Sequence, residues 1–429
     1  MDLYDDRTLP PPELTAANFK VPEPTHWIVK GKWRAADQPE WTRAGHPLVE
    51  ALLDAYRYHI NGTTPTIMVS GWVPGFGTQI GGGDAGLKAY RAHWDGTPMS
   101  FNVVGHGPRA CIPEFTLFRE SGGENTGGIM HARFVNLTIR NEWADRCIGS
   151  ASQDQLHGDT WGLLDLENVH FIANPDRKAD GEFGGYGKKF GIRCTARMAY
   201  RVVGCVDYGS QEHFCYVNTA QADPAWGGSM FVGNELLGSS RTMFQIVNRA
   251  NENVPDLVTS HLLFADNTAR DIRGDGGGSI TVAGGHTGPI TIINHRMLNC
   301  QHAGVVVWHD RNVLHGTPKG EDGFSNGDVV IDGLHFDEQS RVSNQQQVQV
   351  NSARSCRIGR RWRIRSYKAA FDFSNIGNGP WFEWKGPLVE HPGFAGPGRK
   401  IKMDTADESN KTLTDAEINA LGTPGTAWE

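Results

Sequence analysis

The sequence predicts an all-β fold, a single-stranded right-handed parallel β-helix in which short strands wind as a solenoid around one long core. Three observations support this prediction: an apolar alternation that recurs along the chain, an unusual glycine content, and an amphipathic helix ahead of the first repeats. Glycine accounts for 53 of the 429 residues, and bulky apolar residues are interleaved with it. Such a chain turns often, because glycine adopts the positive φ angles that tight corners require.

The repeats are stretches in which apolar residues alternate with period two and end in a polar turn. The clearest are residues 134–141, 166–172, 260–266, 292–299 and 331–337, and weaker versions occupy 200–206, 231–237 and 356–362. Period two indicates strands instead of helical repeats, and the mean spacing of roughly 32 residues is too short for propeller blades. Two or three strands per turn, each stacked on its equivalent one turn later, make a parallel β-helix. Four side chains that share a place in the repeat are expected to point inward: Leu137, Val169, Leu262 and Leu334.

An N-terminal capping helix is expected over residues 47–60. Its apolar side chains recur at every fourth residue, at Leu48, Leu52, Tyr56 and Ile60, which is typical of an amphipathic helix. A β-helix exposes an unpaired end that would recruit other strands, and a helix packed there would cover it.

The expected organisation has three parts. Residues 1–44 form an extended arm or cap that contains proline and tryptophan, residues 45–376 form the β-helix, and residues 377–429 form a Pro/Gly-rich segment with one short helix near 414–421.

Composition excludes several classes of function. The net charge of −7 argues against nucleic-acid binding, which needs a basic surface. The sequence contains no run of 18 apolar residues, so no membrane span is expected, and its acidic start does not resemble a secretory signal. The seven cysteines are scattered without a CxxC pair, which predicts free thiols, synthesis in a reducing compartment and no metal site. No cofactor motif is present, and no cofactor is predicted.

The start of the repeats resembles a known superfamily. A short helix, a strand, the segment 104–112 and then the repeat 134–141 are similar to the pectate-lyase-like β-helix proteins, which include polysaccharide lyases, glycoside hydrolases and bacteriophage tailspikes. The resemblance covers roughly residues 45–376 and implies the fold more strongly than an activity. The tripeptide 105–107 resembles one found in polygalacturonase-type glycosidases, but the accompanying Asn-x-Asp and Asp-Asp elements are missing. It is therefore interpreted as a structural turn.

Candidate site residues come from acidic and aromatic loops, because sugar-cleaving sites need carboxylates that converge on a groove. The catalytic candidates are Asp266, Asp271, Asp275 and Asp310. The substrate-binding candidates are Trp308, His309, Arg270, Arg273, Glu212, His213, Arg361 and Arg363. If the mean period holds, the loops after Phe264 and Trp308 lie on adjacent coils and form one groove. Ordinary turns and solvated strand faces would account for the same residues, since Asp, Asn and Gly favour turns in any case.

Three functions remain open from the sequence. The first is a phage virion protein of tailspike type that binds bacterial surface polysaccharide, with or without depolymerising it. Its expected partners are two further copies of the chain in a homotrimer, or other virion proteins. The second is a free, secreted polysaccharide lyase or glycoside hydrolase. The third is a non-enzymatic structural or decoration protein of the virion.

Overall fold

The computed structural model describes residues 22–42, 46–59, 63–74, 100–117, 130–141, 145–150, 160–173, 188–219, 228–238, 241–248, 261–272, 278–299, 304–308, 324–337, 348–359, 363–364, 370–382, 400–405 and 408–412. These residues are mostly strand with one helix, and parallel pairing dominates. The chain divides into two units, the first formed by residues 1–155 and 159–211 and the second by residues 156–158 and 212–429.

The first unit contains the helix and eleven strands among its described residues. In chain order these are β1 (His26–Val29), β2 (Lys32–Ala35), α1 (Pro47–His59), β3 (Thr66–Ser70), β4 (Ser100–Gly105), β5 (Cys111–Pro113), β6 (Phe115–Leu117), β7 (Met130–Asn141), β8 (Arg146–Ser150), β9 (Thr160–Ala173), β10 (Phe190–Val203) and β11 (Val206–Tyr208). One parallel series runs β1, β3, β4, β7, β9 and β10. A second runs β5, β7, β9 and β11, and a third runs β6, β8 and β10.

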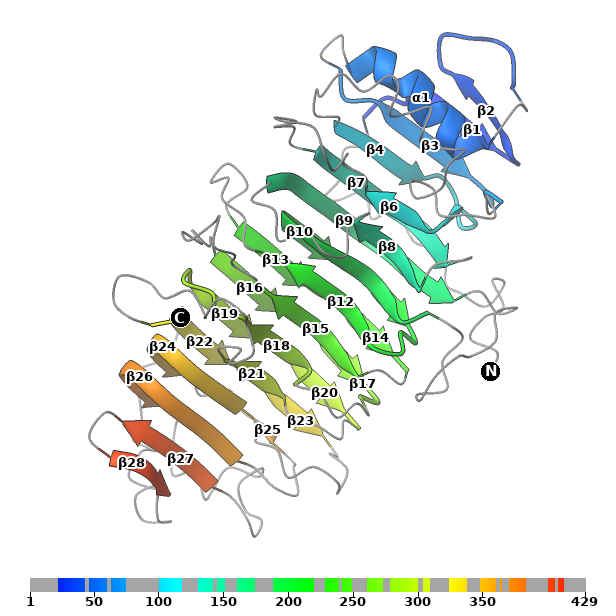
Figure 1. Ribbon diagram of the computed structural model, residues 1–429. Helices are drawn as coiled ribbons and strands as arrows, with labels where there is room; N and C mark the ends of the chain where they lie inside the picture. The colour runs from blue at the N-terminus through cyan, green and yellow to red at the C-terminus, as the bar shows by residue number, and fades with distance from the viewer. Residues whose placement is uncertain are drawn as a thin grey trace. The chain divides into compact units, whose positions relative to one another are not determined.

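The second unit contains the remaining described strands. They are β12 (His213–Asn218), β13 (Gly228–Val232), β14 (Glu235–Leu237), β15 (Thr242–Val247), β16 (His261–Ala265), β17 (Thr268–Arg270), β18 (Ile280–Ala283), β19 (Ile290–Ile293), β20 (Arg296–Leu298), β21 (Val305–Val307), β22 (Asn326–Asp332), β23 (His335–Asp337), β24 (Val348–Ile358), β25 (Arg363–Ile364), β26 (Ala370–Phe382), β27 (Lys400–Thr405) and β28 (Glu408–Thr412). From β12 to β20, each strand pairs in parallel with the strand three places later in the chain. Figure 1 shows one such series, β13, β16, β19 and β22, running side by side.

Apolar side chains stack in register through the second unit. One row joins five strands and consists of Phe231, Phe264, Ile292, Ile331 and Ile358. All five are fully buried, and the rings of Phe231 and Phe264 lie stacked with centroids 5.1 Å apart. The four residues that the repeats predicted to point inward are likewise fully buried, which confirms that prediction.

Residues with a positive φ recur in the repeats: Asn136 and Asn168 lie inside β7 and β9, whereas Asp266 and Asn294 directly follow β16 and β19. Asn136, Asn168, Asp266 and Asn294 have φ between 52° and 55°, and the residue after each of them is fully buried. Asparagine and aspartate tolerate this conformation better than most residues with a side chain. The turn at Asn294 divides the predicted strand 292–299 between β19 and β20, and Gly333, with φ of 69°, divides 331–337 between β22 and β23. Both predicted strands were therefore too long.

The helix α1 lies where the sequence predicted a helix. It packs against β1, β2 and β3, as Figure 1 shows at the blue end of the chain. The buried ring of His26 on β1 is within 2.9 Å of the Asp54 carboxylate on α1, from Nε2 to Oδ2. Residue 60, the expected last residue of the helix, lies outside the described residues.

Strands extend beyond the expected β-helix limits at both ends. Residues 26–35, inside the expected arm, form β1 and β2, and β1 pairs in parallel with β3. Past residue 376, β26 continues to Phe382, and β27 pairs with it in parallel. The helix expected near 414–421 lies outside the described residues.

Six cysteines in the described ranges are free thiols, and Cys300 lies outside these ranges. Burial raises the pKa of Cys194 and of Cys205 to about 12, and it also raises the pKa of Cys147 and Cys356. Because the thiolate is the reactive form, these groups react slowly in the folded protein.

We expect thiol titration of the unfolded, unreduced chain to find all seven cysteines of the sequence, and titration of the folded chain to find far fewer. A count short by two or more after unfolding would contradict free thiols, since one disulfide removes two groups.

Candidate functional site

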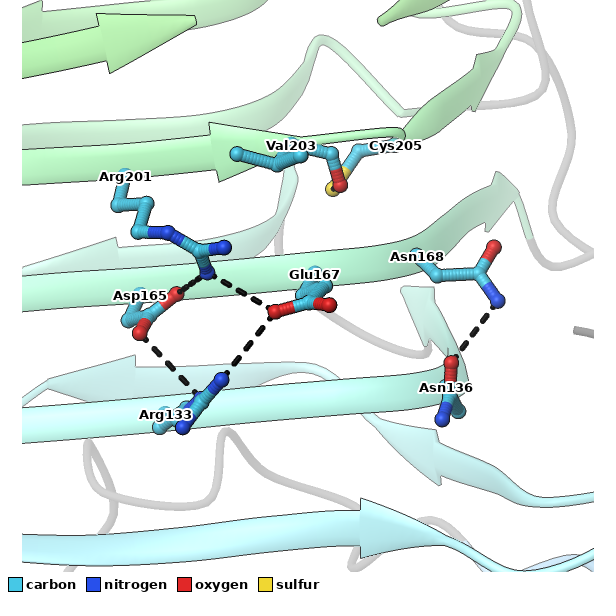
Figure 2. A network of polar contacts seen from close by, with 8 residues as sticks. All are labelled: Arg133, Asn136, Asp165, Glu167, Asn168, Arg201, Val203 and Cys205. Atoms are coloured by element: carbon cyan, nitrogen blue, oxygen red, sulfur yellow. Dashed lines mark hydrogen bonds and ion pairs between the residues drawn. The ribbon is translucent and has the colours of Figure 1, made fainter. Parts of the chain in front are cut away.

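Four charged side chains form a ring of ion pairs in the first unit. Arg133 on β7, Asp165 on β9 and Arg201 on β10 stand directly opposite one another in the parallel register. Glu167 follows Asp165 by two residues, so both carboxylates project from the same face of β9. Figure 2 shows the four side chains closed into a ring.

Each carboxylate in this ring binds both arginines. Arg201 Nη1 lies 2.7 Å from Asp165 Oδ1 and 3.0 Å from Glu167 Oε2. Arg133 Nε lies 3.3 Å from Asp165 Oδ2, and Arg133 Nη2 lies 3.2 Å from Glu167 Oε2. The ring therefore brings together two negative and two positive groups from three successive strands of one series.

The four side chains keep part of their surface in solvent. The exposed fraction is 34% for Arg201, 22% for Arg133, 17% for Glu167 and 8% for Asp165. Burial alone lowers the pKa of Arg201, but hydrogen bonds and charge from Asp165 and Glu167 outweigh it, so the pKa is raised. Arg201 is accordingly a permanent cation, able to donate hydrogen bonds at any working pH.

A histidine lies beside the ring. His131 is two residues before Arg133 on β7, and its pKa is lowered, chiefly by burial and further by the charge of Arg133, against the opposing charge of Asp165. Its imidazole is consequently neutral at neutral pH and can accept a proton or a hydrogen bond.

The neighbouring positions along the strands hold the ring in place. Asn168 Nδ2 donates to Asn136 Oδ1 at 2.9 Å, which links β9 and β7 just beyond the ring residues (Figure 2). Val135, the residue before Asn136, pairs with Glu167 and belongs to a buried apolar cluster with Met68 and Val104. The charged groups thus stand on paired strands, beside a side-chain hydrogen bond and a buried apolar cluster.

The predicted catalytic residues Asp266 and Asp271 lie at turns of the second unit. Asp266 follows β16 with φ of 55° and accepts a hydrogen bond from Asn294 Nδ2 at 2.9 Å. Asp271 follows β17 with φ of 53° and accepts one from Asn299 Nδ2 at 2.5 Å. Each carboxylate therefore has a turn asparagine of the next coil as its partner.

Trp308 and the carboxylates follow three different strands. Trp308 is 39% exposed and comes directly after β21, which pairs with β18, whereas Asp266 follows β16 and Asp271 follows β17. The strands of Phe264 and Trp308 do belong to successive coils, but they are members of different parallel series. The common groove of these loops stays a prediction.

The predicted binding residues of the second unit are also separated. Arg270 Nε forms an exposed ion pair with Glu235 Oε1 at 2.9 Å. His213 is buried at the start of β12, where its ring lies 5.4 Å from that of Tyr216, and Glu212 precedes it half-buried. Arg363 lies on β25, and only its backbone is described. The other predicted site residues fall outside the described ranges: Arg273, Asp275, His309, Asp310 and Arg361.

Sequence reasoning missed the charged ring, although a signal for it existed. Arg133 and Asp165 each come directly before the residue that starts a recognised repeat, and Arg201 is the second residue of the weaker repeat 200–206. Superposing the repeats at 134, 166 and 202 would have aligned an arginine, an aspartate and an arginine on one outward face. The residues predicted from the sequence lie instead mainly in acidic and aromatic loops.

In the part of the chain that the structure describes, no group of three His, Cys, Asp or Glu side chains could hold a metal ion. The one helix found there is too short and too polar to cross a bilayer. No protein-family model, curated protein or solved structure matches the chain.

Proposed function

We propose that this chain is a right-handed parallel β-helix of tailspike type that binds bacterial surface polysaccharide, and that the charged ring on β7, β9 and β10 takes part in binding. The observation that carries the proposal is the ring itself. Two carboxylates and two guanidinium groups are held by one another on neighbouring strands, and all except the buried Asp165 remain partly exposed.

Sugar hydroxyls suit such a ring because each hydroxyl both donates and accepts a hydrogen bond. A carboxylate beside a guanidinium offers an acceptor and a donor at the same time, so a pair of adjacent hydroxyls can bind both. Groups already fixed by their ion pairs lose little conformational entropy when the ligand arrives. Arg133 and Arg201 would also attract an acidic glycan, since the guanidinium geometry matches a carboxylate.

The strand pairing supports the β-helix part of the proposal. Strands three places apart in the chain pair in parallel through much of the second unit, as expected if each coil contributes one strand to each of three series. A repeated coil places equivalent side chains about 4.8 Å apart along one face, which suits a polymer whose sugars also repeat.

The proposal predicts that Arg201→Ala weakens glycan binding about tenfold or more, because it removes charge-assisted hydrogen bonds from the ring. Binding would be measured by calorimetry with purified acidic and neutral bacterial surface polysaccharides. Reducing-end and unsaturated-uronate assays on the bound glycan would distinguish cleavage from binding alone, and the mass in solution would test for the expected homotrimer.

Arg354→Ala is the matched control. Arg354 forms an exposed ion pair with Asp328 in the second unit, with NH2 2.5 Å from Oδ2, and its loss should leave binding unchanged. Trp308→Ala tests the loops predicted from the sequence. If only this variant loses affinity, the ring is not the binding site. If the protein without substitutions binds no glycan of the panel, the polysaccharide proposal fails, and a decoration protein becomes the better explanation.

A further inference from the structure

A lysine and an aspartate lie against each other in the interior of the first unit. Lys188 precedes β10 and Asp207 lies on β11, and both side chains are fully buried. Lys188 Nζ contacts Asp207 Oδ1 and donates to the carbonyl of Phe171 at 2.9 Å. The backbone amide of Ser210 donates to Asp207 Oδ2 at 3.3 Å. The nitrogen of one side chain is therefore held directly at the carboxyl of the other.

The ionic form of this pair is costly at such a position. Removing two charges from water carries a large desolvation penalty, which their attraction only partly offsets. Transfer of one proton from Lys188 to Asp207 gives a neutral amine and a neutral carboxylic acid, and it leaves no charge on either buried side chain. The same transfer produces a nucleophile and an electrophile that are already in contact.

A third ionisable group belongs to the same buried cluster. Glu114, 1% exposed, directly precedes β6. Its charge, like those of Lys188 and Asp207, acts on the buried thiol of Cys147. The thiol donates to the carbonyl of Ile172 at 3.5 Å, one residue beyond the carbonyl that Lys188 binds. Glu114 is thus a second buried carboxyl group near Cys147, the thiol on which Lys188 and Asp207 also act.

We propose that Lys188 and Asp207 become joined by an intramolecular amide bond after the chain folds. The neutral Nζ attacks Cγ of the protonated Asp207 carboxyl and forms a C–N bond. The C–O bond to the hydroxyl then breaks, and one water molecule leaves. Glu114 accepts the proton that Nζ loses and returns it to the departing hydroxyl. Atoms and charge balance without an oxidant or a co-reactant.

Contact in a rigid site explains why this reaction proceeds here and not at surface lysines. Fixing the two groups together makes the step unimolecular, and well-oriented groups of this kind reach very high effective concentrations. The amide also removes the buried charges altogether. The resulting cross-link closes the segment between Lys188 and Asp207, and it ties β11 to the start of β10.

The experiment is mass spectrometry of the full-length, denatured protein. The expected mass is lower than that of the sequence by one water molecule, and a protease digest should contain a branched peptide that joins the segments around residues 188 and 207. If the protein has the full mass of its sequence and the digest contains a linear peptide with unmodified Lys188, the proposal is overturned. Because this measurement is made on the protein without any substitution, it does not depend on the folding of a variant.

Two lysine variants identify the bond. Lys188→Met should restore the full mass expected for its sequence, whereas Lys189→Met, at the adjacent half-buried position, should still lose one water. Glu114→Gln should form the bond more slowly in a time course after purification. Loss of water that persists in Lys188→Met would assign the modification elsewhere and refute the cross-link.

Discussion

Replacing Leu262 with Asp is expected to unfold the second unit. Leu262 is fully buried on β16, and its in-register neighbours are Ser229 on β13 and Ile290 on β19. An unpaired carboxylate in this stack costs several kcal/mol, which is a large share of the roughly 5–15 kcal/mol that stabilises a typical domain. Urea denaturation followed by circular dichroism should show a cooperative transition at a much lower urea concentration, or a chain that is already unfolded in the absence of urea.

Leu263→Asp is the matched control, because it makes the same chemical change at the next residue of the same strand. Leu263 is half-buried and faces the other way, where its in-register neighbour Met230 is 38% exposed. We expect its urea midpoint to move only slightly, since a carboxylate at that face stays hydrated. Equal losses from the two substitutions would contradict the inward and outward assignment of β16.

The second large effect is acid destabilisation through His295. This residue is fully buried, its ring Nε2 lies 2.8 Å from Ser279 Oγ, and burial lowers its pKa to about 3. The unfolded chain binds a proton near pH 6.5, and the folded chain does not do so until about pH 3. Stability from this group is therefore complete above the unfolded pKa and falls by about 1.4 kcal/mol per pH unit as the pH decreases through that window.

His295→Leu should reduce this dependence. Leucine is the natural choice because Leu334 occupies the equivalent place one coil later. The free energy of unfolding, measured in urea between about pH 7 and about pH 5, should fall less steeply in the variant than in the unmodified chain. Ser352→Ala serves as the control, since it removes a buried polar group of the same unit that does not titrate in this pH range. An unchanged slope in His295→Leu would show that this histidine is not the source.

The sequence by itself determined the main features of the fold. Period-two alternation identified strands, because alternate side chains of a strand face opposite sides, and it placed Leu137 and Leu262 in the core. The helix over residues 47–59 was equally accessible, since its apolar stripe is local. Strand lengths were predicted less well, because the alternation does not reveal that Asn294 turns the chain at a positive φ.

Only the tertiary structure decided which polar groups meet. Arg133, Asp165 and Arg201 are each separated by more than thirty residues of chain, yet the parallel register makes them neighbours. Lys188 and Asp207 look like ordinary surface residues in the sequence, and only the fold buries them in contact with each other. Local patterns specify which side of a strand a residue occupies, whereas the partner across the strands depends on loop lengths that vary from one coil to the next. For that reason the sequence located the core but not the charged ring.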